Sequence, residues 1–127
     1  MKLWIDDVRP APDGYVWIKS VNEAESFIKK CEENSNNHYH LAVKCFNKGN
    51  EVDFFKHIGI GAESAIELID TDHDAGDYAY DGGDYIKLLD WLEETGRNYH
   101  IRIHTANPVG AANMRAIIER NGWKEVK

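Results

Sequence analysis

Short apolar segments that each end in a cluster of acidic, histidine or amide side chains are the feature that most constrains the fold of this chain. There are three of them: residues 3–5 precede Asp6 and Asp7, residues 66–69 precede the stretch 70–74, and residues 101–103 precede 104–107. Runs of this length, bounded by charged and turn residues, are typical of strands buried on both sides of a parallel sheet. We therefore expect a buried sheet whose polar residues gather where the strands end.

Helical patterns separate these segments. Ser20 and Glu23 have the spacing of a capping box and begin a helix with an apolar face. Asp84 is expected to cap a second helix that Gly96 ends, and residues 111–120 are predicted as a third. Each of these helices presents apolar residues along one stripe and is expected to pack against the sheet.

Two further strands are predicted over residues 15–18 and 123–126. Strands that alternate with helices imply right-handed crossovers and a mostly parallel sheet with helices on both faces. We therefore predict one α/β domain over residues 1–127, built as a three-layer α/β/α sandwich. Within it, residues 38–62 leave two interpretations open, because an apolar alternation around a turn favours a β-hairpin while a helix over residues 52–57 fits as well.

Composition restricts the location and the partners. The net charge of −7 repels a phosphate backbone, so long nucleic acid is not expected as a partner, although a local pocket for a nucleotide or RNA end stays compatible with it. No segment approaches the roughly 20 apolar residues of a membrane span, and acids follow the N-terminus too early for a secretory signal. Cys31 and Cys45 lack a metal or redox spacing and are predicted as buried free thiols. A cytoplasmic location is expected.

The polar clusters are expected to meet. In open α/β sheets, ligands bind outside the carboxyl ends of the strands. Three clusters that each follow a strand should therefore share one pocket, although acids in such positions also cap helices or remain solvated in turns.

The side chains in these clusters suit phosphate chemistry with a metal. Asp6, Asp7, Asp72 and Asp74 offer carboxylate oxygens, which favour a divalent cation such as Mg²⁺ or Mn²⁺. We predict His73 and His104, together with Asp72, as the catalytic residues. The two imidazoles would carry protons or complete the coordination, because histidine changes charge near neutral pH.

Several neighbouring residues have two open interpretations. Arg9 either binds phosphate oxygens or forms a salt bridge with Asp6 or Asp7. Asn107 either orients a ligand or forms a turn before the last helix. Two further features also have two interpretations: Gly82-Gly83-Asp84 is either a phosphate cradle or an ordinary turn, and Tyr78 and Tyr80 either stack on a base or pack within their loop.

Three motifs in this order resemble the cyclic-phosphate processing receiver-like domains. They are Leu3-Trp4-Ile5-Asp6-Asp7-Val8-Arg9-Pro10, Asp72-His73-Asp74 and His104-Thr105-Ala106-Asn107-Pro108-Val109-Gly110. The resemblance covers most of the chain except residues 35–62, which are predicted to be an insertion. It implies a receiver-like (flavodoxin-like) fold and a role in binding or hydrolysing cyclic phosphates, such as RNA 2′,3′-cyclic ends.

By this likeness Asp6 and Asp7 correspond to the metal-binding acids of receivers, Asp72 to the phosphoacceptor and Thr105 to the hydroxyl residue after the fourth strand. The chain departs from receivers in lacking a clear later strand that ends in Lys. The leading prediction is a metal-assisted phosphoesterase in which Arg9, Thr105 and Asn107 hold the phosphate of a small ligand or RNA end. The alternatives are a sensor that binds a cyclic nucleotide or is phosphorylated on Asp72, and an interaction module with a vestigial site.

Overall fold

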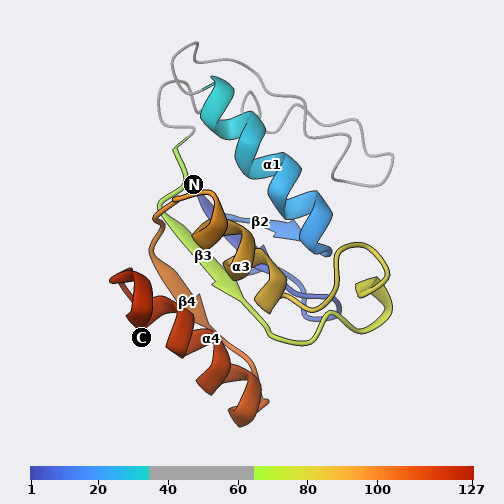
Figure 1. Ribbon diagram of the computed structural model, residues 1–127. Helices are drawn as coiled ribbons and strands as arrows, with labels where there is room; N and C mark the ends of the chain where they lie inside the picture. Colours follow the sequence, from blue (N-terminus) through green and yellow to red (C-terminus); the bar gives the residue numbers. More distant parts are fainter. Residues whose placement is uncertain (35–64) are drawn as a thin grey trace.

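A four-stranded, all-parallel sheet forms the centre of the computed structural model, which describes residues 1–34 and 65–127 (Figure 1). The strands are β1 (Lys2–Ile5), β2 (Tyr15–Ile18), β3 (Leu68–Thr71) and β4 (Ile101–Ile103), in the spatial order β2-β1-β3-β4. The strands predicted over residues 3–5, 15–18, 66–69 and 101–103 are therefore present. Of these, β3 is displaced: it spans Leu68–Thr71 instead of residues 66–69, so that Asp70 lies inside the strand.

The α-helices follow the strands as expected. They are α1 (Val21–Asn34), α3 (Ile86–Glu94) and α4 (Pro108–Asn121), and a 3-10 helix, η1 (Gly76–Tyr78), lies in the β3–α3 connection. Ser20 caps α1, since its Oγ accepts the Glu23 amide at 3.1 Å.

Two helix starts differ from the sequence predictions. The last helix begins three residues before the predicted position, because Asn107 caps it and Pro108 fits the first turn. Asp84 does not cap α3 through its side chain. Its Oδ1 instead accepts the amide of Ala75 at 3.0 Å, closing the loop that precedes the helix.

The three α-helices lie side by side on one face of the sheet (Figure 1). The connections from β2 to β3 and from β3 to β4 advance in the same direction across the sheet, so right-handed crossovers place their helices on the same side. No α-helix of residues 1–34 and 65–127 covers the opposite face, so these residues supply two of the three predicted layers.

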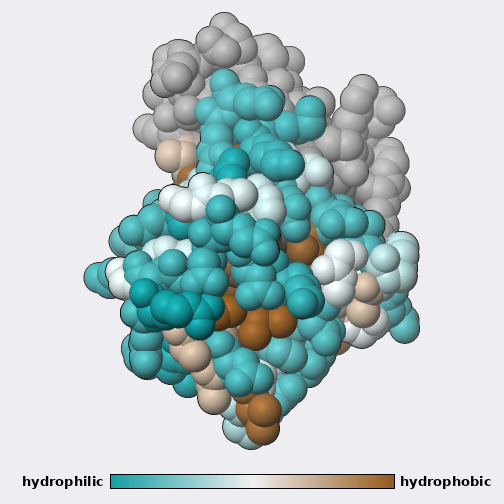
Figure 2. All heavy atoms as spheres, viewed as in Figure 1, coloured by the Kyte–Doolittle hydropathy of each residue, from teal (hydrophilic) through white to brown (hydrophobic). Residues whose placement is uncertain are grey.

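The main core lies between the helices and every second strand residue. The strands contribute six apolar side chains to it, those of Leu3, Ile5, Val16, Ile18, Ile69 and Ile101. Phe27, Leu89 and Met114 from the three helices are fully buried against them. Each such side chain contributes roughly 1.5–3 kcal/mol of burial free energy. Figure 2 shows the outer surface of this layer as mainly hydrophilic, with a small hydrophobic area between α3 and α4.

The other face of the sheet carries the alternate strand residues, and most of these are aromatic or charged instead of aliphatic. The strand register aligns Trp17, Trp4, Asp70 and Arg102 in one row across the four strands. Because residues two apart on a strand share a face, Asp6, Asp72 and His104 continue this face just beyond the strand ends. The polar clusters are therefore extensions of the face opposite the helices.

Three remaining predictions concern the end of the chain, the cysteines and residues 38–62. The predicted closing strand is reduced to one parallel bridge between Ile101 and Glu125. Cys31 is a buried free thiol, as predicted, and burial raises its pKa to about 12. Cys45 and the hairpin or helix of residues 38–62 fall outside the described residues. None of the described helices combines the length and apolar character that crossing a bilayer requires.

Candidate functional site

The carboxyl ends of β1 and β3 bring three acids together. One carboxylate oxygen from each of Asp6, Asp7 and Asp72 lies within 4.8 Å of the others. The two strands are hydrogen-bonded neighbours, and the amide of Asp72 continues the ladder by donating to the carbonyl of Ile5 at 2.9 Å. Parallel pairing thus places residues 66 positions apart in the sequence in one acidic group.

Asp6 is fully buried and has several hydrogen-bond donors. Its Oδ1 accepts the amides of Val8 and Arg9, both at 2.9 Å, and its Oδ2 accepts from Nε2 of His104 at 2.9 Å. Burial alone would raise the pKa of Asp6, but the amide hydrogen bonds and His104 outweigh it and lower the pKa. Asp6 is therefore held as a carboxylate.

Asp7 shows the opposite perturbation. Burial raises its pKa, and the negative charges of Asp6 and Asp72 raise it further. Repulsion among the three carboxylates thus remains at Asp7, and a cation is the simplest way to relieve it. The donor set is all oxygen and is partly enclosed, which fits Mg²⁺ or Mn²⁺. Asp6, Asp7 and Asp72 are the residues that would hold such an ion.

Arg9 lies over the edge of this group. Its guanidinium is 3.7 Å from Oδ2 of Asp6 and 3.9 Å from Oδ2 of Asp72, and it donates to the carbonyl of His104 at 2.9 Å. The salt-bridge interpretation of Arg9 is therefore present in the structure, with Asp72 as an additional partner. The Arg9 side chain is still 47% exposed, so part of its guanidinium group is accessible to an anion.

His104 occupies a closed network on the face opposite the helices. Its Nε2 bonds Oδ2 of Asp6 at 2.9 Å, its Nδ1 bonds Oδ1 of Asp70 at 2.7 Å, and its ring stacks on Trp4 with centroids 3.8 Å apart. The side chain is only 7% exposed. Asp70 also accepts from Arg102 at 2.9 Å.

This network differs from the predicted role of His104 in moving protons. Both ring nitrogens are taken by carboxylates that are themselves fully buried, so neither nitrogen is open to a substrate. Two hydrogen bonds to ionised carboxylates require two N–H donors, which a neutral imidazole does not have. The ring therefore fits an imidazolium that holds Asp6 in place, or a neutral ring with the second proton on Asp70.

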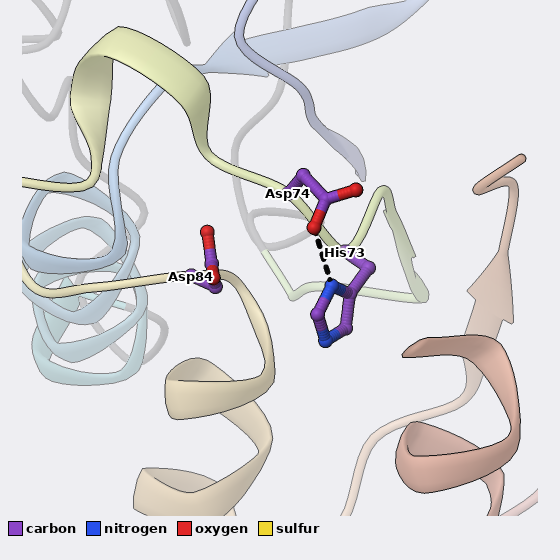
Figure 3. Close-up of side chains that lie close together, drawn as sticks. All are labelled: His73, Asp74 and Asp84. Carbon is purple, nitrogen blue, oxygen red and sulfur yellow. Dashed lines mark hydrogen bonds and ion pairs between the residues drawn. The ribbon is translucent and has the colours of Figure 1, made fainter. Parts of the chain in front are cut away.

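His73 has the open geometry that His104 lacks. Its Nδ1 bonds Oδ1 of Asp74 at 2.8 Å, and the other ring nitrogen points away from that carboxylate (Figure 3). The ring packs against Gly110 of α4, where a Cβ would lie only 2.5 Å from Cγ of the imidazole. The backbone amide of His73 donates to Oδ1 of Asp72 at 2.7 Å, so the backbone of His73 adjoins the acidic group.

Asp74 belongs to this second group and not to the first. His73, Asp74 and Asp84 each offer a ligand atom within 4.8 Å of the others, and they approach from the two ends of the β3–α3 connection (Figure 3). The single four-acid metal site predicted from the sequence is thus divided in the structure. Asp6, Asp7 and Asp72 form one group, and Asp74 pairs with His73.

The family comparison covers nearly the whole chain. A family model described as cyclic-phosphate processing receiver domain matches residues 1–41 and 42–120. The chain belongs to this family. No curated protein and no solved structure shows significant similarity to it. The family and the parallel sheet together give the flavodoxin-like α/β fold predicted from the sequence.

Within this receiver domain, Thr105 and Asn107 shape the β4–α4 loop. The amide of Asn107 donates to Oγ1 of Thr105 at 3.1 Å, and Oδ1 of Asn107 accepts the amide of Gly110 at 2.9 Å. Asn107 is thus the turn and cap that one interpretation expected, and its Nδ2 lies 3.5 Å from Oδ2 of Asp74. The contact of Thr105 and Asn107 with a phosphate stays a prediction.

Two backbone amides in and after the glycine loop before α3 already have acceptors within the protein. The amide of Gly83 donates to the carbonyl of Ala79 at 2.9 Å, and that of Tyr85 donates to His73 at 2.9 Å. These amides are already bonded. The interpretation as ordinary loop packing is the one that the structure supports for Gly82-Gly83-Asp84.

The receiver lysine has no equivalent at this site among the described residues. After α4 the chain runs beside the beginning of β4, where Glu125 forms an isolated bridge with Ile101 and the Lys124 carbonyl accepts the amide of Ile101. Lys124 is therefore at the opposite end of the sheet from the acids.

Asp70 is a member of the site network that the sequence did not predict. The strand was predicted to end at residue 69, which made Asp70 part of a polar stretch. The signal was available in the spacing, because Asp70 and Asp72 are two apart and share a sheet face when the strand continues through residue 71.

Proposed function

We propose that this receiver domain is a phosphoesterase that opens cyclic phosphates, with a divalent cation as its cofactor and a nucleotide or RNA 2′,3′-cyclic end as the ligand. The observation that carries this proposal is the His73–Asp74 pair beside the acidic group. Transfer of a phosphoryl group to the carboxylate of a receiver does not require an imidazole with an open ring nitrogen. Hydrolysis needs such a group to move a proton.

Asp6, Asp7 and Asp72 would hold the cation. Bound there, it would supply Lewis-acid stabilisation of the phosphoryl oxygens and would lower the pKa of a bound water. Arg9, with half of its side chain exposed beside Asp72, would bind a non-bridging phosphate oxygen.

His73 would carry the proton. A carboxylate at Asp74 accepts from Nδ1 of His73, so in the neutral ring Nδ1 would carry the proton and Nε2 would keep its lone pair. Nε2 accepts a proton as the oxygen of water forms a bond to phosphorus. It then returns that proton to the ring oxygen of the substrate as the P–O bond breaks, which leaves a phosphomonoester and a free hydroxyl. Asp74 stabilises the intervening imidazolium, as an acid does in an Asp–His pair.

The test is turnover of 2′,3′-cyclic nucleotides with Mg²⁺ and with Mn²⁺. His73→Gln is expected to lower kcat about 10²–10⁴-fold, the usual contribution of a general acid–base. The matched control is His100→Gln, since His100 is an exposed imidazole at the beginning of β4, far from the acids. Absence of turnover with either metal, or equal turnover in wild type and His73→Gln, overturns the proposal.

The second candidate is a sensor phosphorylated on Asp72. Membership of a receiver family favours it, as does the position of Asp72 among two further acids. Against it, Asp72 is only 6% exposed and one of its oxygens already accepts an amide. Incubation with acetyl phosphate, followed by mass measurement of wild type and Asp72→Asn, distinguishes it from the phosphoesterase.

A further inference from the structure

A lysine lies between aromatic rings on one side of the acidic group. The Lys19 ammonium lies 4.3 Å from the centroid of the Trp17 ring and 5.9 Å from that of Tyr78. The Tyr78 ring in turn stacks on Tyr80 with centroids 6.5 Å apart and planes 27° from parallel. These four residues, Trp17, Lys19, Tyr78 and Tyr80, come from two segments about 60 positions apart, and we call them the aromatic–lysine cluster.

The cluster adjoins the acids directly. Nε1 of Trp17 donates to the carbonyl of Asp6 at 2.8 Å. On the other side, Gly76 at the start of η1 lies so close to Asp7 that a Cβ there would be 2.2 Å from a carboxylate oxygen. Tyr78 ends this same 3-10 helix, so both halves of the cluster are anchored on the acidic group. Figure 1 shows the loop with η1 extending beyond the carboxyl ends of β1 and β2.

The backbone beneath Lys19 is also fixed. The carbonyl of Lys19 accepts the hydroxyl of the fully buried Tyr85 at 2.7 Å, and the following Ser20 bonds Asp81 from the η1 loop. The amide of Asn22 donates to the carbonyl of Asp81 at 3.1 Å. The two segments are therefore joined by several hydrogen bonds, and the ring positions do not depend on one weak contact.

The exposed parts of the cluster fit a planar, anionic ligand. Tyr80 is 83% exposed, one of three large hydrophobic side chains with such exposure in the described part of the chain. Lys19 forms no ion pair with a carboxylate of residues 1–34 or 65–127, in contrast to Arg9, Arg97, Arg102, Arg115 and Arg120. Nucleobases stack on tyrosine and tryptophan faces, and an ammonium beside them attracts the attached phosphate.

We propose that the aromatic–lysine cluster is a base-binding subsite, so that the substrate is a cyclic phosphate that carries a nucleobase. This rests on the proposed phosphoesterase function and assigns the residues that would bind the base of its nucleotide ligand. With the phosphate at the acids, the base would stack on Tyr80 and Tyr78, and Lys19 would lie between the base and the phosphate. The overall charge of −7 limits this contact to a single nucleotide or the end of a strand.

The experiment compares two substrates that share the cyclic phosphate. One is adenosine 2′,3′-cyclic phosphate and the other is glycerol 1,2-cyclic phosphate, which has no base. Tyr80→Ala is expected to raise KM for the adenosine compound about tenfold with kcat nearly unchanged, and to leave both constants for the glycerol compound as in wild type. Tyr80→Phe, which keeps the ring, is the matched control and should behave as wild type.

Calorimetric titration of the two compounds into wild type and Tyr80→Ala separates this inference from the proposed function. Base-dependent binding without turnover supports the subsite while the phosphoesterase proposal fails. Equal affinity for both compounds in wild type, or an equal loss for both in Tyr80→Ala, overturns the subsite even if turnover is measured. Lys19→Met is expected to weaken binding of both compounds, and the loss should shrink at high salt.

Discussion

Replacing His104 with alanine tests whether this histidine is a structural or a proton-transferring residue. The substitution removes the two hydrogen bonds to Asp6 and Asp70 and the ring that stacks on Trp4. It leaves two fully buried carboxylates with fewer partners, since Asp70 keeps Arg102 and Asp6 keeps two amides. We expect a large loss of folding stability.

The size of this loss in folding free energy follows from the burial of Asp6, Asp70 and His104. Removing one partner of a buried ion pair typically costs about 3–5 kcal/mol, because the remaining charge is left without compensation. Loss of the stacked ring adds about 0.5–1.5 kcal/mol. The partners that Asp6 and Asp70 retain reduce the cost, so the expected total is roughly 3–4 kcal/mol. For a domain of this size that corresponds to a fall in Tm of roughly 10–15 °C.

Urea unfolding followed by circular dichroism measures this difference. The matched control is His73→Ala, whose side chain is 14% exposed and bonds the 58% exposed Asp74. That variant is expected to lose less stability than His104→Ala, because the His73 ring bonds one exposed carboxylate instead of two buried ones, and its turnover is expected to fall about 10²–10⁴-fold. If His104→Ala unfolds within about 1 kcal/mol of wild type, the network does not stabilise the fold and the argument for a positioning role fails.

Three further predictions concern single residues. In EDTA at pH 7, Asp7→Asn should unfold at a higher urea concentration than wild type. Folding raises the pKa of Asp7 above its ordinary value of 3.8, so the charged carboxylate destabilises the folded state at pH 7. Mg²⁺ should not raise the Tm of this variant, and a lower urea midpoint than wild type contradicts the prediction. Gly110→Ala should reduce turnover with little change in the urea midpoint, because the added Cβ displaces the His73 ring; wild-type kinetics would show that the ring position is unimportant. Tyr85→Phe should cost about 1–2 kcal/mol in urea unfolding, since the carbonyl of Lys19 loses a buried donor, and an unchanged midpoint would show that water replaces it.

Most of the fold could be predicted from local sequence patterns. Apolar runs, the Ser20 cap and the apolar helix stripes each depend on residues within a few positions of one another. The sequence therefore predicts strands β1, β2 and β4 and helices α1, α3 and α4 at or near their positions. The errors occurred where a tertiary contact decides a boundary. β3 continues through Thr71 because β1 and β4 pair with it, and Asp84 turns to the amide of Ala75 instead of capping α3.

The sequence by itself determined which residues reach the carboxyl ends of the strands, because strand length and alternation are local properties. Only the tertiary structure decided how those residues are paired. Asp70 and His104 are 34 positions apart and Asp6 and His104 are 98 apart, yet their atoms meet within 2.9 Å. Such pairings depend on strand order and register, which bring distant residues into contact. The same order and register make His104 a buried partner of two acids, while one ring nitrogen of His73 stays open.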